Sequence, residues 1–231
     1  MIKQIKQEFN KIYVIEDFIS DDTSNFLANC FDEDLKEFDL HPHIKYGPSQ
    51  HYISSRNSFE DYNNSPQHNM GIDIFTNICV SISETVSDIY EEPFAIKHAM
   101  YAAMYEGSVG DLHMDNHYIS QKNELKAKKY DRVCRSALLY FTDNYEGGEL
   151  YFPRQNIKYK PKKNSLIIFE GDYTLPHQVL KVTSGERKNF ICFLSPKKDI
   201  NLNEPAIEEE DGEIWLTEDI VTNENIMGVL E

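Results

Sequence analysis

Residues 134–153 read CRSALLYFTDNYEGGELYFP and carry the pattern on which the fold prediction rests. Two apolar segments, 134–142 and 149–153, are rich in Leu, Tyr and Phe, and aromatic residues in short runs favour β-strands. The segment 144–148 between them, NYEGG, contains the residue types that allow turns. The stretch therefore predicts a strand, a turn and a second strand.

The same pattern extends to both sides of this stretch. Short apolar segments alternate with turn residues over most of the second half of the chain. The other predicted strands are 94–105, 110–115, 165–170, 177–182 and 187–194. A succession of short strands separated by turns is typical of β-sandwiches and jelly rolls.

The first part of the chain has a helical pattern instead. Residues 11–19 predict a strand, and a serine then offers a capping hydroxyl for a helix that ends near Glu33. A second helix is expected over 71–91, because apolar residues recur there every three or four positions. The intervening 41–69 has the composition of a long irregular connection. Two helices followed by many strands predict an α+β fold.

Composition places the chain among globular proteins. Its 231 residues are 40% hydrophobic and 12% aromatic, which is enough for one domain with a full core. No apolar run is long enough to predict a membrane span, and the N-terminus lacks the apolar centre of a secretory signal. The scattered cysteines predict reduced thiols in a cytoplasmic protein, with a single disulfide pair as the alternative. They are Cys30, Cys79, Cys134 and Cys192.

Acidic residues outnumber basic ones by 39 to 23, so the formal net charge is −16. A negative field opposes binding to a phosphate backbone, and we therefore expect no nucleic-acid partner, just as we expect no membrane partner. Residues 204–224 are acidic and contain no Lys or Arg. We treat 200–231 as an acidic C-terminal extension. Its apolar positions 214–216 and 220–221 either pack back on the body or belong to a disordered tail.

His113 and Asp115 are separated by one residue within a predicted strand. Alternate residues of a strand project to the same face, so the imidazole and the carboxylate point together. His177 begins a later predicted strand. Two histidines and one carboxylate on one face are the ligand set of non-haem Fe(II) oxygenases. Taken alone, a His-x-Asp sequence is more often an ordinary hydrogen-bonded pair.

Arg187 follows His177 by ten residues. In a flat hairpin the two residues would be about 20 Å apart, at roughly 3.3 Å per residue, which is too far to share a small diacid. A jelly roll shortens this distance, because consecutive strands can lie in opposite sheets. A shared ligand therefore requires a closed β-roll, and the alternative for Arg187 is a surface arginine beside a turn.

From residue 96 to 194 the chain resembles the prolyl 4-hydroxylase-like branch of the 2-oxoglutarate/Fe(II) oxygenase superfamily. Four stretches carry the resemblance: MYEG followed by HMD in 104–115, SALLYFTD followed by GGELYFP in 136–153, PKKNSLIIF in 161–169, and HQV followed by VTSGER in 177–187. Four motifs in the family's order form a far more specific signal than any one of them.

The resemblance implies a double-stranded β-helix (jelly-roll) core flanked by N-terminal helices. It implies a single oxygenase domain over 1–199, with the N-terminal strand and helices in 1–93 and the β-roll core in 94–199. Fe(II) and 2-oxoglutarate are the implied cofactors, ascorbate is an additional candidate, and dioxygen is the co-reactant. The implied activity couples oxidative decarboxylation of 2-oxoglutarate to hydroxylation, most directly of a peptide or protein.

The resemblance also implies roles for individual residues. The implied iron ligands are His113, Asp115 and His177. Arg187 would bind the distal carboxylate of 2-oxoglutarate, which its planar fork suits. Ser136 would help to hold the same carboxylate, or is an ordinary strand serine. Tyr105 would line the cosubstrate pocket, or packs as a buried aromatic.

The chain departs from the family pattern in places, and other functions stay open. Gly110 occupies a position where the family often has a tyrosine, and residues 118–132 are expected to form a loop or flap beside the site. Phe193 replaces the further arginine of AlkB-type nucleic-acid demethylases, which disfavours that activity. The remaining alternatives are a hydroxylase of a free amino acid or small metabolite, and a non-catalytic β-roll that binds a ligand.

Overall fold

The computed structural model describes residues 7–9, 11–35, 41–43, 47–53, 66–127, 135–199 and 216–222. In that part of the chain, no helix is long and apolar enough to span a membrane. Cys134 and most of the acidic extension lie outside the described residues, so the expectations for them stay predictions.

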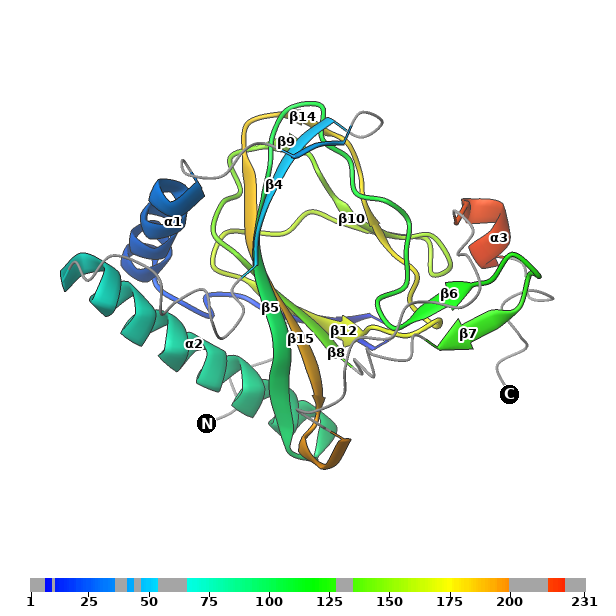
Figure 1. Ribbon diagram of the computed structural model, residues 1–231, viewed down its shortest axis with the longest axis horizontal. Helices are drawn as coiled ribbons and strands as arrows, with labels where there is room; N and C mark the ends of the chain where they lie inside the picture. The colour runs from blue at the N-terminus through cyan, green and yellow to red at the C-terminus, as the bar shows by residue number, and fades with distance from the viewer. Residues whose placement is uncertain are drawn as a thin grey trace.

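An eight-stranded antiparallel sheet forms one layer of the molecule (Figure 1). Its strands lie in the order β1-β2-β12-β8-β15-β5-β4-β3. In chain order their bounds are Gln7–Phe9 (β1), Ile12–Ile15 (β2), His41–His43 (β3), Gly47–Ile53 (β4), Phe94–Met104 (β5), Arg135–Tyr140 (β8), Leu166–Glu170 (β12) and Arg187–Pro196 (β15), which the 3₁₀ turn Lys197–Asp199 follows. Most neighbours in this order are distant along the chain, as expected for a roll.

Shorter strands form the opposite layer. Their bounds are Glu146–Gly147 (β9), Leu150–Phe152 (β10), Ile157–Tyr159 (β11), Gln178–Val179 (β13) and Val182–Ser184 (β14). β10 pairs with β11 and β13, and β14 pairs with β9. A single antiparallel bridge between His113 and His177 lies beyond the end of β13. Two layers of strands with N-terminal helices are the predicted jelly-roll architecture.

Two helices, α1 (Asp21–Leu35) and α2 (Pro66–Tyr90), lie together on one side of the large sheet (Figure 1). The α1 helix begins as the sequence predicts, because the backbone N–H of Thr23 donates to the Ser20 hydroxyl at 3.2 Å. The α2 helix begins five residues earlier than predicted. Its Ile82 and Val86 are fully buried and pack in the cluster between helices and sheet.

The β12 strand is buried on both faces, because the helices cover one face and the second layer covers the other. Leu166 and Ile168 pack in the cluster that includes the helices. Ile167 and Phe169 pack in a second cluster, inside the roll. In β8, Tyr140 belongs to the inner cluster by the same alternation. The inward-facing side chains of these strands therefore line the interior of the roll, where the candidate site lies.

Two of the predicted irregular segments contain strands. The expected loop 41–69 includes β3 and β4, and β4 extends the large sheet by pairing with β5. The expected flap 118–132 includes a hairpin of β6 (His117–Ile119) and β7 (Leu125–Ala127). Neither pairing was predictable from short polar segments, since their partners are chosen by tertiary contacts. Residues 54–65 and 128–132 lie outside the described residues.

The prediction of a strand over 110–115 is wrong. Within it the structure has only the bridge at His113, which pairs with His177 through both backbone N–H···O=C bonds at 2.9 Å. His113 and Asp115 therefore do not point together because of strand alternation, although their side chains still converge.

A short helix, α3 (Glu218–Thr222), lies beside the β6–β7 hairpin (Figure 1). Leu216 and Ile220 pack against a small cluster that includes Met114 and Ile119. At least this part of the C-terminal extension thus packs back on the body, which was one of the two alternatives.

Candidate active site

His113, Asp115 and His177 form a compact group at one end of the roll. Their ligand atoms all lie within 4.8 Å of one another, close enough to share a metal ion. The Oδ1 atom of Asp115 lies 3.3 Å from Nε2 of His113 and 3.8 Å from Nε2 of His177. Two imidazoles and a carboxylate are a donor set that suits Fe(II), and three donors leave further coordination positions open.

Backbone carbonyls determine which imidazole nitrogen faces this group. Nδ1 of His113 lies 2.7 Å from the carbonyl oxygen of Asp111, and Nδ1 of His177 lies 3.1 Å from that of Leu175. A carbonyl oxygen only accepts hydrogen bonds, so each Nδ1 must carry the proton. Each Nε2 then keeps its lone pair toward Asp115. Such outer hydrogen bonds are the usual way in which proteins orient histidine ligands.

Burial and charge determine the ionisation of Asp115 and His177. Burial alone would raise the pKa of Asp115, but His177, His113 and the Ser136 hydroxyl together lower it to about 2. Burial lowers the pKa of His177 to about 4, and Asp115 only partly opposes this. At neutral pH the carboxylate is therefore ionised and His177 is neutral, as metal ligands require.

Ser136 supports Asp115 from the large sheet. Its hydroxyl donates to Oδ2 of Asp115, so Oδ1 is the oxygen that faces the two histidines. Gly171 lies against the same pair. A Cβ atom at position 171 would lie 2.9 Å from the Ser136 hydroxyl and 3.1 Å from Cβ of Asp115. A side chain at position 171 would therefore have to displace Ser136 or Asp115.

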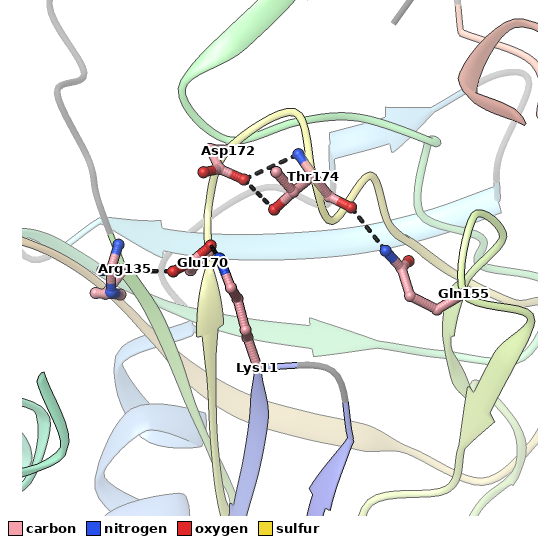
Figure 2. A network of polar contacts seen from close by, with 6 residues as sticks. All are labelled: Lys11, Arg135, Gln155, Glu170, Asp172 and Thr174. Carbon is pink, nitrogen blue, oxygen red and sulfur yellow. Dashed lines mark hydrogen bonds and ion pairs between the residues drawn. The ribbon is translucent and has the colours of Figure 1, made fainter. Parts of the chain in front are cut away.

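A network of polar contacts orders the loop that leads from Gly171 to His177 (Figure 2). The Asp172 carboxylate accepts from the backbone N–H of Thr174 at 2.9 Å and from its hydroxyl at 2.5 Å. The carbonyl of Thr174 accepts from the Gln155 side chain at 2.7 Å. The loop therefore reaches His177 with a defined backbone path.

The base of the same loop is held by charges. Glu170, the last residue of β12, pairs with Lys11 at 3.0 Å and with Arg135 at 3.5 Å (Figure 2). On the inner side, the ring of His177 packs edge-on against Phe169, with 4.7 Å between centroids, and lies tilted against Phe152 at 5.8 Å. These aromatic rings keep water from that side of the histidine.

Arg187 lies on the inward face of β15 and is 1% exposed. Its Nε donates to the carbonyl of Gly148 at 3.2 Å, and its Nη2 donates to the Tyr140 hydroxyl at 2.7 Å. Its Nη1 donates to Oδ1 of Asn189 at 2.7 Å. Among the described residues, no carboxylate lies within ion-pair distance of this guanidinium. A buried cation without an anion is costly, and a carboxylate ligand would supply the missing charge.

Two implied cosubstrate contacts lie elsewhere. Ser136 contacts Asp115, and the strand register places it four residues along β8 from Tyr140, which contacts Arg187. Tyr105 is partly buried and packs against the cluster on the helix side of the sheet, away from the inward face that carries Arg187. At Gly110, a Cβ atom would lie 3.0 Å from Cβ of Val179 and 3.1 Å from its backbone nitrogen, so the tyrosine of the family pattern would require Val179 to shift.

Sequence reasoning missed Tyr140, Tyr145 and Asn189, all of which are buried near Arg187. The sequence could have indicated Tyr140, because side chains alternate between the two faces of a strand and Tyr140 lies four residues after Ser136, on the same inward face. Tyr145 lies in a loop, and its direction depends on contacts made at a distance along the chain.

Comparison with known proteins agrees with this geometry. Residues 99–195 match the family model of the 2OG-Fe(II) oxygenase superfamily. No curated protein matches the chain in sequence. The matched region contains His113, Asp115, His177 and Arg187.

Solved structures similar to this chain include several prolyl hydroxylases. The viral collagen prolyl hydroxylase of Paramecium Bursaria Chlorella virus-1, as its 2OG complex, is 19% identical with a TM-score of 0.56, over 80% of this chain and 95% of that one. A Pseudomonas putida prolyl-4-hydroxylase is 18% identical with a TM-score of 0.52, over 81% and 93%.

A prolyl hydroxylase from Trichoplax adhaerens, in complex with a hypoxia inducible factor peptide fragment, is 15% identical with a TM-score of 0.63, over 85% and 88%. At these sequence identities the solved structures show a similar fold only. The family is indicated separately, by the match of residues 99–195 to the family model. Over residues 99–195 the chain matches the 2OG-Fe(II) oxygenase superfamily, and its fold is that of the prolyl hydroxylases among the similar solved structures.

Proposed function

We propose that this protein is an Fe(II)- and 2-oxoglutarate-dependent hydroxylase that acts on a prolyl residue of a peptide or protein. The observation that carries the proposal is the pairing of two features inside one roll. His113, Asp115 and His177 offer three converging ligand atoms, and Arg187 is a buried cation without an anion among the described residues. A keto diacid bound to the metal would need both features.

His113, Asp115 and His177 would hold the iron. When bound, Fe(II) supplies the oxygen chemistry that couples decarboxylation of 2-oxoglutarate to hydroxylation of the substrate. The protein's own contribution is orientation. The carbonyls of Asp111 and Leu175 keep both Nε2 atoms unprotonated toward the metal position, and Asp115 offers Oδ1 because its other oxygen accepts from a serine.

Arg187 and Tyr140 would bind the distal carboxylate of 2-oxoglutarate. Their 2.7 Å contact lies on the inward face of the large sheet, and Tyr140 is fully buried. An ion pair formed away from water is less screened than one at the surface, so the anion is attracted strongly once it has entered. The aromatic wall of Phe152 and Phe169 would keep the neighbouring ligand, His177, dry.

A peptide or protein substrate is supported by the fold, since the similar structures include prolyl hydroxylases and one of them carries a peptide fragment. We propose a cytoplasmic setting, because Cys79 and Cys192 are free thiols. We also propose that residues 1–199 act as a single domain. Ascorbate is proposed as an accessory reductant.

Succinate formation from labelled 2-oxoglutarate tests the function. The purified protein would be incubated aerobically with Fe(II), with and without ascorbate, in three substrate arms: proline-containing peptides, free L-proline, and no substrate. The proposal expects peptide-stimulated succinate and a peptide that gains one oxygen atom at proline by mass spectrometry. Stimulation by free proline alone would transfer the assignment to a small-molecule hydroxylase. Tight binding of 2-oxoglutarate without turnover in any arm would indicate a non-catalytic β-roll.

A further inference from the structure

The guanidinium of Arg187 has few donors left for a ligand. Each terminal nitrogen carries two N–H groups. Both donors of Nη1 have partners, Asn189 Oδ1 at 2.7 Å and the Met104 sulfur at 3.6 Å. Nε donates to Gly148, and one donor of Nη2 is directed to Tyr140. At most one N–H of Nη2 remains, and it lies near the Tyr145 oxygen, so Arg187 cannot bind a carboxylate bidentately unless it gives up a protein contact.

A carboxylate accepts several hydrogen bonds, so other donors must complete its site. Two unused donors are buried in this region. The Tyr145 O–H and Nδ2 of Asn189 have no hydrogen-bond acceptor among the described residues. Tyr145 is 2% exposed and Asn189 is 0% exposed, so water does not satisfy them from outside. Unpaired buried donors are costly unless a ligand engages them.

Both donors lie beside Arg187. A Cβ atom at Gly148 would lie 3.0 Å from the Tyr145 ring and 3.2 Å from Cδ of Arg187, so these two side chains pack over the same glycine. Burial raises the pKa of Tyr145, while the charge of Arg187 and a side-chain hydrogen bond from Arg187 to the tyrosine oxygen act in the opposite direction, so the two side chains lie within reach of each other.

The orientation of Asn189 follows from its contact with Arg187. A guanidinium only donates, so the atom of Asn189 that contacts Nη1 must be the carbonyl oxygen. The amide Nδ2 then points away from the guanidinium. Asn189 lies directly opposite Tyr140 in the strand register, on the same inward face.

We propose that the Tyr145 hydroxyl and the Asn189 amide complete the site for the distal carboxylate of 2-oxoglutarate, together with Tyr140 and Arg187. The inference rests on the proposed function, and it assigns cosubstrate selection to two residues outside the family motifs quoted above. Arg187 supplies the charge, and the neutral donors supply the remaining hydrogen bonds. The site thereby prefers a keto acid that ends in a carboxylate over one of equal length that ends in a methyl group.

Calorimetric titration with 2-oxoglutarate and with 2-oxopentanoate tests the inference. The two acids share the keto acid end and differ only in the distal carboxylate. Nickel(II) would replace iron, so that no turnover occurs and binding alone is measured. The variants are Tyr145→Phe, which removes only the hydroxyl, and Asn189→Asp, which keeps the oxygen that holds Arg187 and loses the amide donor. Tyr90→Phe is the matched control, because its hydroxyl is also buried and without a partner among the described residues, but lies beside Arg135.

We expect Tyr145→Phe to weaken 2-oxoglutarate about tenfold or more, the effect of one hydrogen bond to a charged group, and to leave 2-oxopentanoate unchanged. Asn189→Asp should lower the preference for 2-oxoglutarate over 2-oxopentanoate further. The new carboxylate removes the amide donor and also pairs with Arg187 in place of the ligand. Tyr90→Phe should keep the wild-type preference.

Equal weakening of both acids by Tyr145→Phe would show a merely structural role and overturn the inference. An unchanged preference in both variants would overturn it while leaving the proposed function intact. A wild-type protein that binds both acids equally would instead contradict the proposed function itself.

Discussion

The hydroxyl of Ser136 donates to Oδ2 of Asp115, across from the two histidines that face Oδ1. The two residues are 21 positions apart in the chain and come together because β8 runs beside the loop that carries Asp115. One oxygen of the carboxylate is thus occupied by the protein, and the other is directed to the metal position. The geometry of the metal site depends on the sheet as well as on the ligands themselves.

Replacing Ser136 with alanine should weaken metal binding by about 10- to 100-fold, the range typical of lost outer-shell partners. The variant leaves Oδ2 of Asp115 buried without its donor, so the carboxylate can rotate. Cobalt(II) titration followed by visible absorption would measure the affinity. Ser165→Ala is the control, since Ser165 is equally buried but donates to the carbonyl of Lys162. Equal affinities in wild type and Ser136→Ala would refute the orienting role.

A methyl group at Gly171 should disrupt the same pair. The added Cβ would lie 2.9 Å from the Ser136 hydroxyl and 3.2 Å from Oδ2 of Asp115, so Gly171→Ala must displace one of them. We expect metal affinity to fall by at least about tenfold. Gly71→Ala is the control, because its Cβ meets nothing closer than the Cys30 sulfur at 3.4 Å. Cobalt(II) titration of both variants measures the metal affinity. An unchanged affinity in Gly171→Ala would mean that the loop moves to accept the methyl group without disturbing Ser136 or Asp115.

Replacing Arg187 with methionine should abolish stabilisation by 2-oxoglutarate. A ligand at 100 times its dissociation constant stabilises the folded state by about 2.7 kcal/mol, which appears as a rise in melting temperature. In Arg187→Met this rise should disappear. Arg187→Met also removes the hydrogen bonds to Gly148, Asn189 and Tyr140, so the rise is measured for each protein against its own melting temperature without ligand. Retained stabilisation by 2-oxoglutarate would place the diacid elsewhere.

Placing a charge at Val221 should release α3 from the β6–β7 hairpin. Val221 is fully buried, so aspartate at this position would be an unpaired buried charge. We expect faster hydrogen exchange in residues 117–127, which α3 partly covers. Asp219→Ser, at an exposed position of the same helix, should leave exchange there unchanged. If Val221→Asp also left it unchanged, α3 would not stabilise the hairpin.

The candidate metal ligands and Arg187 were predictable because they stand in short motifs that can be recognised in the sequence. The His113-x-Asp115 motif, His177 and Arg187 stand in the order that the family requires, and the turn-separated apolar segments predicted the roll. The inference that His177 and Arg187 can share a ligand only in a closed β-roll agrees with the structure. His177 precedes β13 in the small layer, and Arg187 begins β15 in the large sheet.

What could not be predicted depends on contacts between distant segments. Tyr145 and Asn189 are ordinary residues in sequence, and they become candidate ligands only because Arg187 uses most of its donors within the protein. Ser136 faces the interior as expected, but only the tertiary structure shows that it meets Asp115. The β3 and β4 strands form because an edge of the large sheet is available to pair with them.

The most direct test of the account is anaerobic titration of the purified protein with Fe(II) and then with 2-oxoglutarate, beside a His113→Ala variant. We expect one iron per chain, a charge-transfer absorption band when 2-oxoglutarate is added, and loss of the band in the variant. A band of equal intensity in His113→Ala, or no iron binding by the wild-type protein, would contradict the assignment of His113, Asp115 and His177 as the metal site.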